Sequence, residues 1–267
     1  MSRAIWSGNL QLALLNVPVK LHKANKDADV HFKGVHAVCH STLNQKKWCA
    51  KCNREVTATE LNKGFALSKD QIIEFSENEL EAVAVAESRQ IRIERVIEPA
   101  EMPIIATDSI YYLQPDKYAE HTYSLLAKAL QVKPVILVGR LIMRSKEHLC
   151  AISGYEGGIM LRTLHWHDEL NPIKPLLEKI EAVSDEELQL ANMLLDKYRA
   201  PFGHEAFKDT YREKVIEMLH KKMKGEIITI TQEVKVIQPT LDLMADLRRS
   251  LEAPGGVLET QIPLVKA

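Results

Sequence analysis

Three β-strand patterns follow one another in residues 135–164, VILVGRLIMRSKEHLCAISGYEGGIMLRTL. The patterns lie at Val135–Met143, His148–Ser153 and Ile159–Leu164, and the Gly157-Gly158 pair predicts a hairpin turn between the second and the third. Apolar residues that recur with a period of two are typical of strands with one buried face. This stretch therefore predicts short strands separated by turns.

The same alternation extends from this stretch toward the N-terminus. It recurs over residues 10–21, and again near residues 91–93 and 111–113. Six or more short strands predict a barrel or a sandwich. One helix is expected among them, from Tyr118 to Leu130, and Pro134 ends it.

After Asn171-Pro172 the pattern changes from strands to helices. The predicted helices are one that begins with the capping box Ser184–Glu187 and ends at Pro201, a second over Glu205–Lys224 capped by Gly225, and a third over Leu241–Leu251 capped by Thr240. These helices carry too little apolar surface to fold alone. We therefore expect them to dock on the strand core or on another subunit.

Charge is balanced over the whole chain but segregated along it. The 267 residues contain 35 Lys and Arg against 36 Asp and Glu, which excludes a uniformly basic nucleic-acid binder. Residues 33–54, however, contain five cationic residues and no acid. No apolar stretch approaches the roughly 18 residues that a membrane span needs, and no signal peptide pattern is present, so we expect a soluble, cytoplasmic protein.

The clearest motif for chemistry is His36-x-x-Cys39 followed by Cys49-x-x-Cys52. Two close pairs of donors suit tetrahedral zinc, and four protein ligands make a closed, structural site. His40 is an alternative fourth ligand to His36, and three free thiols are the alternative to a metal site.

Signatures of catalysis are absent. The sequence contains no Walker A loop, no G-x-G-x-x-G, no H-E-x-x-H and no G-x-S-x-G, and the cysteine motif lacks the glutamate and proline of nucleobase deaminases. We interpret His165–Asp168 as a surface cluster at a strand end and Cys150 as a buried apolar residue. The sequence therefore favours a protein that is not an enzyme.

Several motifs, in order along the chain, resemble the prokaryotic Ku family, whose members bind DNA ends in non-homologous end joining. The matching stretches are Arg3–Gly8, Leu15–Leu21, Asn62–Phe65, Tyr111–Lys117, Arg144–Leu149, Ala200–Phe202 and Asp209–Glu213. The ordered match runs from about residue 2 to residue 230.

This resemblance implies an α+β fold with a Ku-type β-barrel core in residues 1–180. Within the core, residues 24–75 would form an extended bridge loop that carries the zinc site. A helical arm over residues 181–235 would embrace the partner subunit, and residues 236–267 would form a short C-terminal segment and tail.

The function that the resemblance implies is a homodimeric ring that slides onto double-stranded DNA ends without sequence specificity. The ring would work at the nucleoid and recruit the ATP-dependent DNA ligase D. One structural Zn²⁺ per subunit is implied, with His36, Cys39, Cys49 and Cys52 as its ligands. The expected ligase-binding residues are Leu243, Met244, Leu247 and Leu251.

Binding to any DNA end requires phosphate contacts rather than base readout. The candidate phosphate-binding residues are Lys46, Lys47, Lys51, Arg54, Lys63, Arg140 and Arg144. Two other interpretations stay open on the residues alone, a zinc-ribbon module that regulates through nucleic-acid binding and a metal hydrolase with an open zinc position.

Overall fold

The computed structural model describes residues 3–68, 71–76, 79, 89–144, 146–177, 181–226 and 242–252. The chain divides into two units. Unit 1 comprises Met1–Ala28 and Lys33–Pro172, and unit 2 comprises Asp29–Phe32 and Ile173–Ala267. The main boundary thus falls at Pro172, where the sequence pattern changes from strands to helices.

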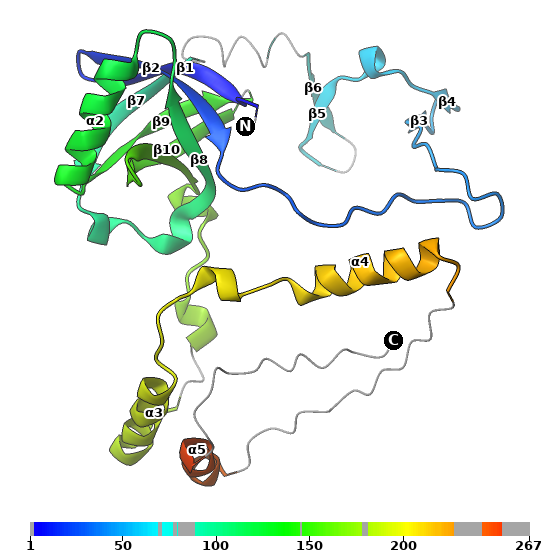
Figure 1. Ribbon diagram of the computed structural model, residues 1–267. Helices are drawn as coiled ribbons and strands as arrows, with labels where there is room; N and C mark the ends of the chain where they lie inside the picture. The colour runs from blue at the N-terminus through cyan, green and yellow to red at the C-terminus, as the bar shows by residue number, and fades with distance from the viewer. Residues whose placement is uncertain are drawn as a thin grey trace. The chain divides into compact units, whose positions relative to one another are not determined.

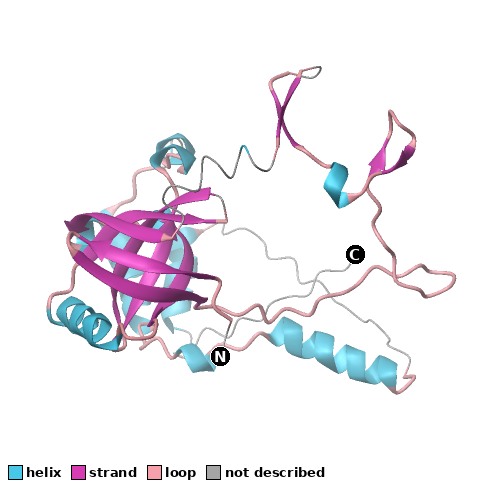
Figure 2. Ribbon diagram, turned by 90° about the horizontal axis from the view of Figure 1, so that it is seen from above, coloured by secondary structure: helices cyan, strands magenta, loops and turns pink. Residues whose placement is uncertain are grey.

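A closed barrel of seven strands forms the centre of unit 1, in the order β1-β2-β8-β11-β10-β9-β7 (Figure 1, Figure 2). Its strands are β1 (Trp6–Leu12), β2 (Leu15–Lys23), β7 (Gln90–Ile97), β8 (Thr107–Pro115), β9 (Ile136–Met143), β10 (Lys146–Tyr155) and β11 (Gly158–Leu164). All neighbours are antiparallel except β1 and β7, which pair in parallel and close the barrel. The prediction of a barrel or sandwich is therefore resolved in favour of the barrel.

A tight turn joins β10 to β11. Between β10 and β11 the central residues are Glu156 and Gly157, with φ angles of 43° and 83°, and Gly158 already begins β11. Positive φ at both central residues is typical of the type I′ turn, a two-residue turn that matches the twist of the strands. The predicted hairpin is confirmed, but its turn lies one residue earlier than the Gly157-Gly158 pair.

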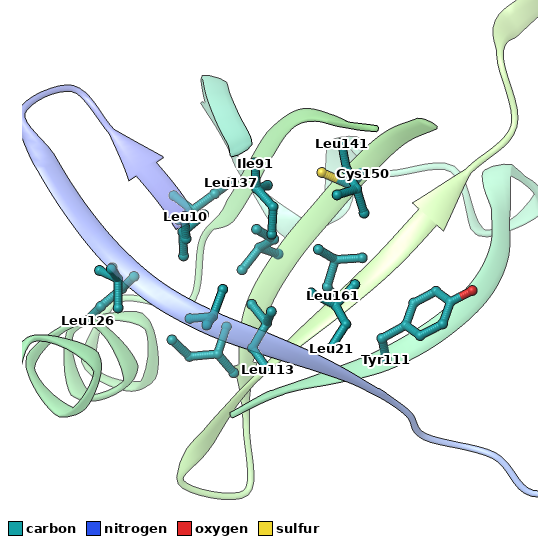
Figure 3. Close-up of a cluster of buried hydrophobic side chains, with 14 of the residues drawn as sticks. Leu10, Leu21, Ile91, Tyr111, Leu113, Leu126, Leu137, Leu141, Cys150 and Leu161 are labelled. Atoms are coloured by element: carbon teal, nitrogen blue, oxygen red, sulfur yellow. The ribbon is translucent and has the colours of Figure 1, made fainter. Parts of the chain in front are cut away.

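The core fills the barrel interior with alternate residues of its strands (Figure 3). Leu10, Leu21, Ile91 and Leu161 have no exposed surface, and neither does Cys150, which confirms it as a buried apolar residue. A helix, α2 (Glu120–Val132), packs on this core through Leu126, Ala127 and Leu130. Its predicted start at Tyr118 is wrong, because Tyr118 has a φ of 68° and so cannot belong to a right-handed helix.

The segment between β2 and β7 contains two small sheets. The first pairs β3 (Trp48–Cys49) with β4 (Arg54–Glu55), and the second pairs β5 (Lys63–Ala66) with β6 (Ile72–Phe75). A single 3-10 turn, Ala58–Glu60, lies between them in sequence. Further 3-10 turns at Pro99–Glu101, Ile104–Ala106 and His167–Glu169 complete the described part of unit 1.

Unit 2 is helical, with α3 (Asp185–Lys197), α4 (Thr210–Met223) and α5 (Leu243–Glu252), and 3-10 turns at Lys174–Leu177 and His204–Ala206. The Ser184 capping box of α3 is confirmed, since the Ser184 hydroxyl accepts a hydrogen bond from the Glu187 N–H. The predicted start of α4 at Glu205 is wrong. Asp209 caps the helix by accepting a hydrogen bond of 2.9 Å from the Arg212 N–H, so the helix begins at Thr210.

The C-terminal ends of α4 and α5 differ in how they are capped. Gly225 follows α4 with a φ of 76°, which confirms it as a C-terminal cap. The Lys197 ammonium group of α3 donates hydrogen bonds of 3.0 and 2.8 Å to the carbonyl oxygens of Ser250 and Leu251, so α3 supplies a cation to the end of α5. The predicted cap Thr240 and the predicted first residue Leu241 lie outside the described residues.

Among the described residues, no helix combines the length and the apolar character that crossing a membrane requires.

Candidate metal centre and nucleic-acid interface

The four predicted zinc ligands lie on two short hairpins of unit 1. In the first, an isolated bridge between Val35 and Thr42 encloses the turn that carries His36 and Cys39. In the second, the β3–β4 pair encloses the turn between Cys49 and Cys52, with Cys49 facing Arg54. Each hairpin therefore presents one of the two predicted pairs of donors.

Within each hairpin, the two donors of the pair lie together. The Nδ1 atom of His36 lies 3.0 Å from the Sγ atom of Cys39. The thiols of Cys49 and Cys52 lie close enough to shift each other's pKa. The structure thus places His36, and not His40, beside Cys39.

A residue with left-handed backbone conformation follows each pair directly. His40 has a φ of 55° and Asn53 has a φ of 49°. Such a residue reverses the chain tightly just after the second donor, which lets both donors of a pair face the same side of the turn. The two hairpins therefore repeat one local geometry, although the residue types around the donors differ.

The thiols have shifted acidities. The hydroxyl group of Ser41, which lies 2.8 Å from Cys39 Sγ, and the Ser41 N–H lower the pKa of Cys39 to about 7. The backbone N–H of Cys52 lowers the pKa of Cys49, and in turn the Cys49 thiol raises the pKa of Cys52. In each hairpin the pKa of one thiol is thus lowered, which makes the thiolate, the form that binds metal, easier to reach.

The two pairs are not joined into one centre. Within the described ranges, no group of three or more His, Cys, Asp or Glu side chains is arranged to hold a metal ion, and this includes His165–Asp168. The donor set fits tetrahedral zinc by its chemistry, because it consists of three thiols and one imidazole in two preformed pairs.

The candidate phosphate-binding residues fall into two groups. Three of them are paired with carboxylates of the same chain. Lys46 lies 2.7 Å from Glu55, and Arg54 binds both carboxylate oxygens of Glu60, at 2.6 and 3.2 Å. The Arg54 guanidinium, with help from Thr57, holds the pKa of Glu60 at about 2, well below the usual value of a glutamate.

Arg140 is also paired, on the outer surface of the barrel. Its guanidinium lies 3.0 Å from Glu94, 3.3 Å from Glu147 and 5.6 Å from the centre of the Trp166 ring. Two carboxylates therefore offset its single charge. The His165–Asp168 cluster, which directly follows β11, contributes to the same surface through Trp166.

The other four candidates are not paired with a carboxylate in the described structure. Lys47, Lys51, Lys63 and Arg144 form no ion pair with any residue in the described part of the chain. Arg144 lies in the turn between β9 and β10 with a φ of 55°. A cation at one of these positions can bind a phosphate without first breaking an ion pair with a carboxylate.

One feature of this region was not predicted from the sequence. The indole of Trp48 lines a groove of about 450 Å³ together with Leu61, Asn62, Gly64 and Ile72, and Lys47 stands at its wall. The only sequence signal for it is the run Lys46-Lys47-Trp48, in which an aromatic residue follows two lysines.

The predicted ligase-binding residues lie on α5, which packs against α3. Met244, Leu247 and Leu251 are half-buried, whereas 48% of Leu243 is exposed. An ion pair of 3.2 Å between Arg248 and Glu186 of α3 adds to this packing. The apolar face of α5 is therefore partly covered within the chain itself.

Comparison with known proteins adds the following. A family model described as the Ku70/Ku80 beta-barrel domain matches residues 11–190. The chain is 33% identical over 253 residues to the protein named "Non-homologous end joining protein Ku" of Archaeoglobus fulgidus, an alignment that covers 94% of this chain and 99% of the relative. A protein of the same name from Heliobacterium modesticaldum is 31% identical over 252 residues, covering 94% and 91%. One from Mycobacterium tuberculosis is 28% identical over 260 residues, covering 94% and 95%.

Proposed function

Because the chain belongs to the Ku family, we propose that it binds the ends of double-stranded DNA without sequence specificity and acts in repair by non-homologous end joining. The observation that carries this proposal is the family match, which runs from residue 11, near the end of β1, to residue 190 and includes the other six barrel strands in full. The relatives that align with 94% of the chain carry that process in their names. The chain would act as a scaffold on DNA and not as an enzyme.

The unpaired cations support this proposal. A protein that reads no bases must hold DNA through its phosphates. We propose Lys47, Lys51, Lys63 and Arg144 as phosphate contacts, since no described carboxylate competes for them. Lys46, Arg54 and Arg140 would have to exchange a carboxylate for a phosphate, so they are weaker candidates.

Assembly into a homodimer is the second part of the proposal. None of the described residues of unit 2 is buried, so its helices have no core of their own. On α4, 70% of Tyr211, 40% of Met218 and 83% of Met223 are exposed. A helix that leaves this much apolar surface in water is stabilised by docking, and a second copy of the chain would provide the surface.

A structural zinc ion is the third part. Its proposed ligands are His36, Cys39, Cys49 and Cys52, two from each hairpin. Zinc would draw the two hairpins together and replace the hydrophobic core that this segment lacks. Of the described residues between 29 and 68, none is buried. A closed site of this kind stabilises the loop and offers no open position for catalysis.

Recruitment of DNA ligase D is the fourth part. The proposed contact surface is α5, with Leu243, Met244, Leu247 and Leu251. Because the last three of these are half-buried against α3, the ligase would meet α5 as part of a helix pair. The same helix also presents the exposed side chains of Leu243 and Arg249.

A gel-shift experiment tests the proposed function. One duplex is prepared in three forms, linear, with both ends closed by hairpins, and as a covalently closed circle, and each is titrated with protein at several salt concentrations. We expect retention on the linear form alone. Equal binding to all three forms would overturn the end-binding mechanism.

A further inference from the structure

The groove beside Trp48 has the size and lining of a small-ligand site. Its volume of about 450 Å³ lies within the range of about 300–1,000 Å³ that is usual for such sites. Four short elements build it, namely β3, the 3-10 turn Ala58–Glu60, β5 and β6. All of them belong to unit 1.

The groove leaves apolar surface exposed where a ligand would lie. Of its lining residues, 60% of Trp48, 42% of Leu61 and 62% of Ile72 are exposed. Gly64 keeps the space open, because a Cβ atom at this position would come within 2.6 Å of the Ile72 side chain. The indole of Trp48 and the aliphatic side chains of Leu61 and Ile72 together line a slot that suits a flat, weakly polar group.

The polar groups around the slot match a nucleotide. Lys47 lines the groove and Lys51 lies in the adjoining turn, and neither forms an ion pair with a described residue. The two acids of the lining are engaged, since Glu60 is bound by Arg54 and Glu74 accepts a hydrogen bond of 3.4 Å from the Asn62 amide. Glu74 keeps its negative charge, because the Asn62 amide is neutral, but Lys47 and Lys51 supply two cations beside the slot that no described carboxylate binds. The Asn62 amide oxygen accepts no hydrogen bond from a described residue, so it can accept one from a base edge.

We propose that this groove binds an unpaired base of a single-stranded overhang, which stacks on Trp48 while Lys47 contacts the adjacent phosphate. Stacking on aromatic side chains beside cationic groups is how proteins bind single strands without sequence preference. A paired base is excluded from the slot because extracting it from the duplex costs a few kcal/mol. This inference rests on the proposed binding to DNA ends, and it adds a preference for overhangs over blunt ends.

The test compares one duplex with three kinds of end by fluorescence anisotropy. The ends are blunt, extended by four thymidines, or extended by four abasic residues that keep the phosphates but lack bases. Stacking is worth ~1–3 kcal/mol per base, so the thymidine overhang should bind about 5- to 150-fold more tightly than the blunt end. The abasic overhang should lose most of that advantage.

Two variants of Trp48 then test whether the groove causes the preference for thymidine overhangs. We expect Trp48→Ala to bind the blunt duplex like wild type and to lose the preference for thymidines, and Trp48→Tyr to keep much of it. Equal affinity of the wild-type protein for thymidine and abasic overhangs would overturn the proposal, and that comparison does not depend on a variant folding. Loss of blunt-end and overhang binding in equal measure in Trp48→Ala would also overturn it. A wild-type protein that ignores blunt ends altogether would instead refute the proposed function.

Discussion

The hydroxyl group of Tyr123 donates a hydrogen bond of 2.6 Å to the backbone carbonyl oxygen of Leu113. It also accepts a hydrogen bond of 3.0 Å from the backbone N–H of Ile159, the residue that faces Leu113 across the β8–β11 pair. One side chain of α2 thus joins two neighbouring strands, and partial burial raises the pKa of its phenol. This arrangement holds α2 on the barrel.

We predict that Tyr123→Phe lowers the free energy of unfolding by about 1–3 kcal/mol, because it leaves a buried carbonyl and a buried N–H without their partner. Urea denaturation measures the change. The matched control is Tyr112→Phe, since Tyr112 is 43% exposed and no hydrogen bond of its hydroxyl group to a described residue is seen. The role of the Tyr123 hydroxyl would be refuted if both variants unfolded at the same urea concentration as wild type.

A second prediction concerns Gly8, over which the Trp6 ring lies. The Trp6 Nε1–H donates a hydrogen bond of 3.0 Å to the carbonyl oxygen of Ile142 in β9. A Cβ atom on Gly8 would collide with that ring and with the Arg89 carbonyl oxygen. Gly8→Ala should therefore cost about 1–3 kcal/mol of stability, as overpacked sites do.

Gly203→Ala is the control for this substitution. No atom lies within 4 Å of the position a Cβ would take at Gly203, and its φ is −83°. Thermal unfolding should leave this variant within about 0.5 kcal/mol of wild type. A Gly8→Ala protein as stable as wild type would show that both the Trp6 ring and the Arg89 backbone move aside without loss.

The sequence predicted the strands because alternation is a local property of buried β-structure. The pattern at Val135–Met143 became β9, which begins one residue later. Barrel closure was not predictable in this way, because it depends on the parallel pairing of β1 with β7, two strands about eighty residues apart in sequence. The predicted helix starts at Tyr118 and Glu205 were wrong because the spacing of apolar residues does not show where a helix is capped. Tyr118 has a left-handed backbone conformation, and Asp209 caps α4.

For the candidate site, residue spacing predicted the two pairs of donors but not their surroundings. Whether a lysine is free depends on carboxylates elsewhere, such as Glu55 for Lys46 and Glu60 for Arg54. The Trp48 groove was missed for the same reason, since its walls come from segments that only the fold brings together. Periodicity carries no information about such contacts.

A third prediction uses the four cysteines as probes. In metal-free protein, Cys39, Cys49 and Cys52 should react with a disulfide reagent, whereas Cys150 should react only after unfolding, because burial raises its pKa to about 12. Addition of about one equivalent of zinc should protect the three loop thiols. Cys49→Ser should lose the metal and lower the melting temperature, and Cys150→Ala should keep the metal. Full reactivity of the loop thiols in zinc-loaded protein would contradict the proposed site.

A fourth prediction concerns the ion pair between Arg54 and Glu60. The pKa of Glu60 is lowered to about 2, so its contribution to stability is fully present above the ordinary glutamate pKa of about 4.5 and is lost as the pH falls toward 2. Carbon NMR of the Glu60 carboxyl group should show this low midpoint. Arg54→Gln should return it toward 4.5, while Lys46→Gln should not move it. An ordinary Glu60 midpoint in wild type would show that the pair does not persist in solution.

The last prediction separates paired from unpaired cations by the salt dependence of DNA binding. Each phosphate that a cation neutralises adds about 0.9 to the slope of log affinity against log salt concentration. Lys51→Gln should therefore lower the magnitude of the slope by about 0.9 and weaken binding to all sequences alike. Arg140→Gln should leave the slope unchanged, because Glu94 and Glu147 already bind that guanidinium. Instead it should destabilise the barrel surface, since two carboxylates lose their common partner and Trp166 loses the cation above its ring. If Arg140→Gln lowered the slope as much as Lys51→Gln, Arg140 would exchange its carboxylates for a phosphate, and ion pairing within the free chain would not identify the residues that contact DNA.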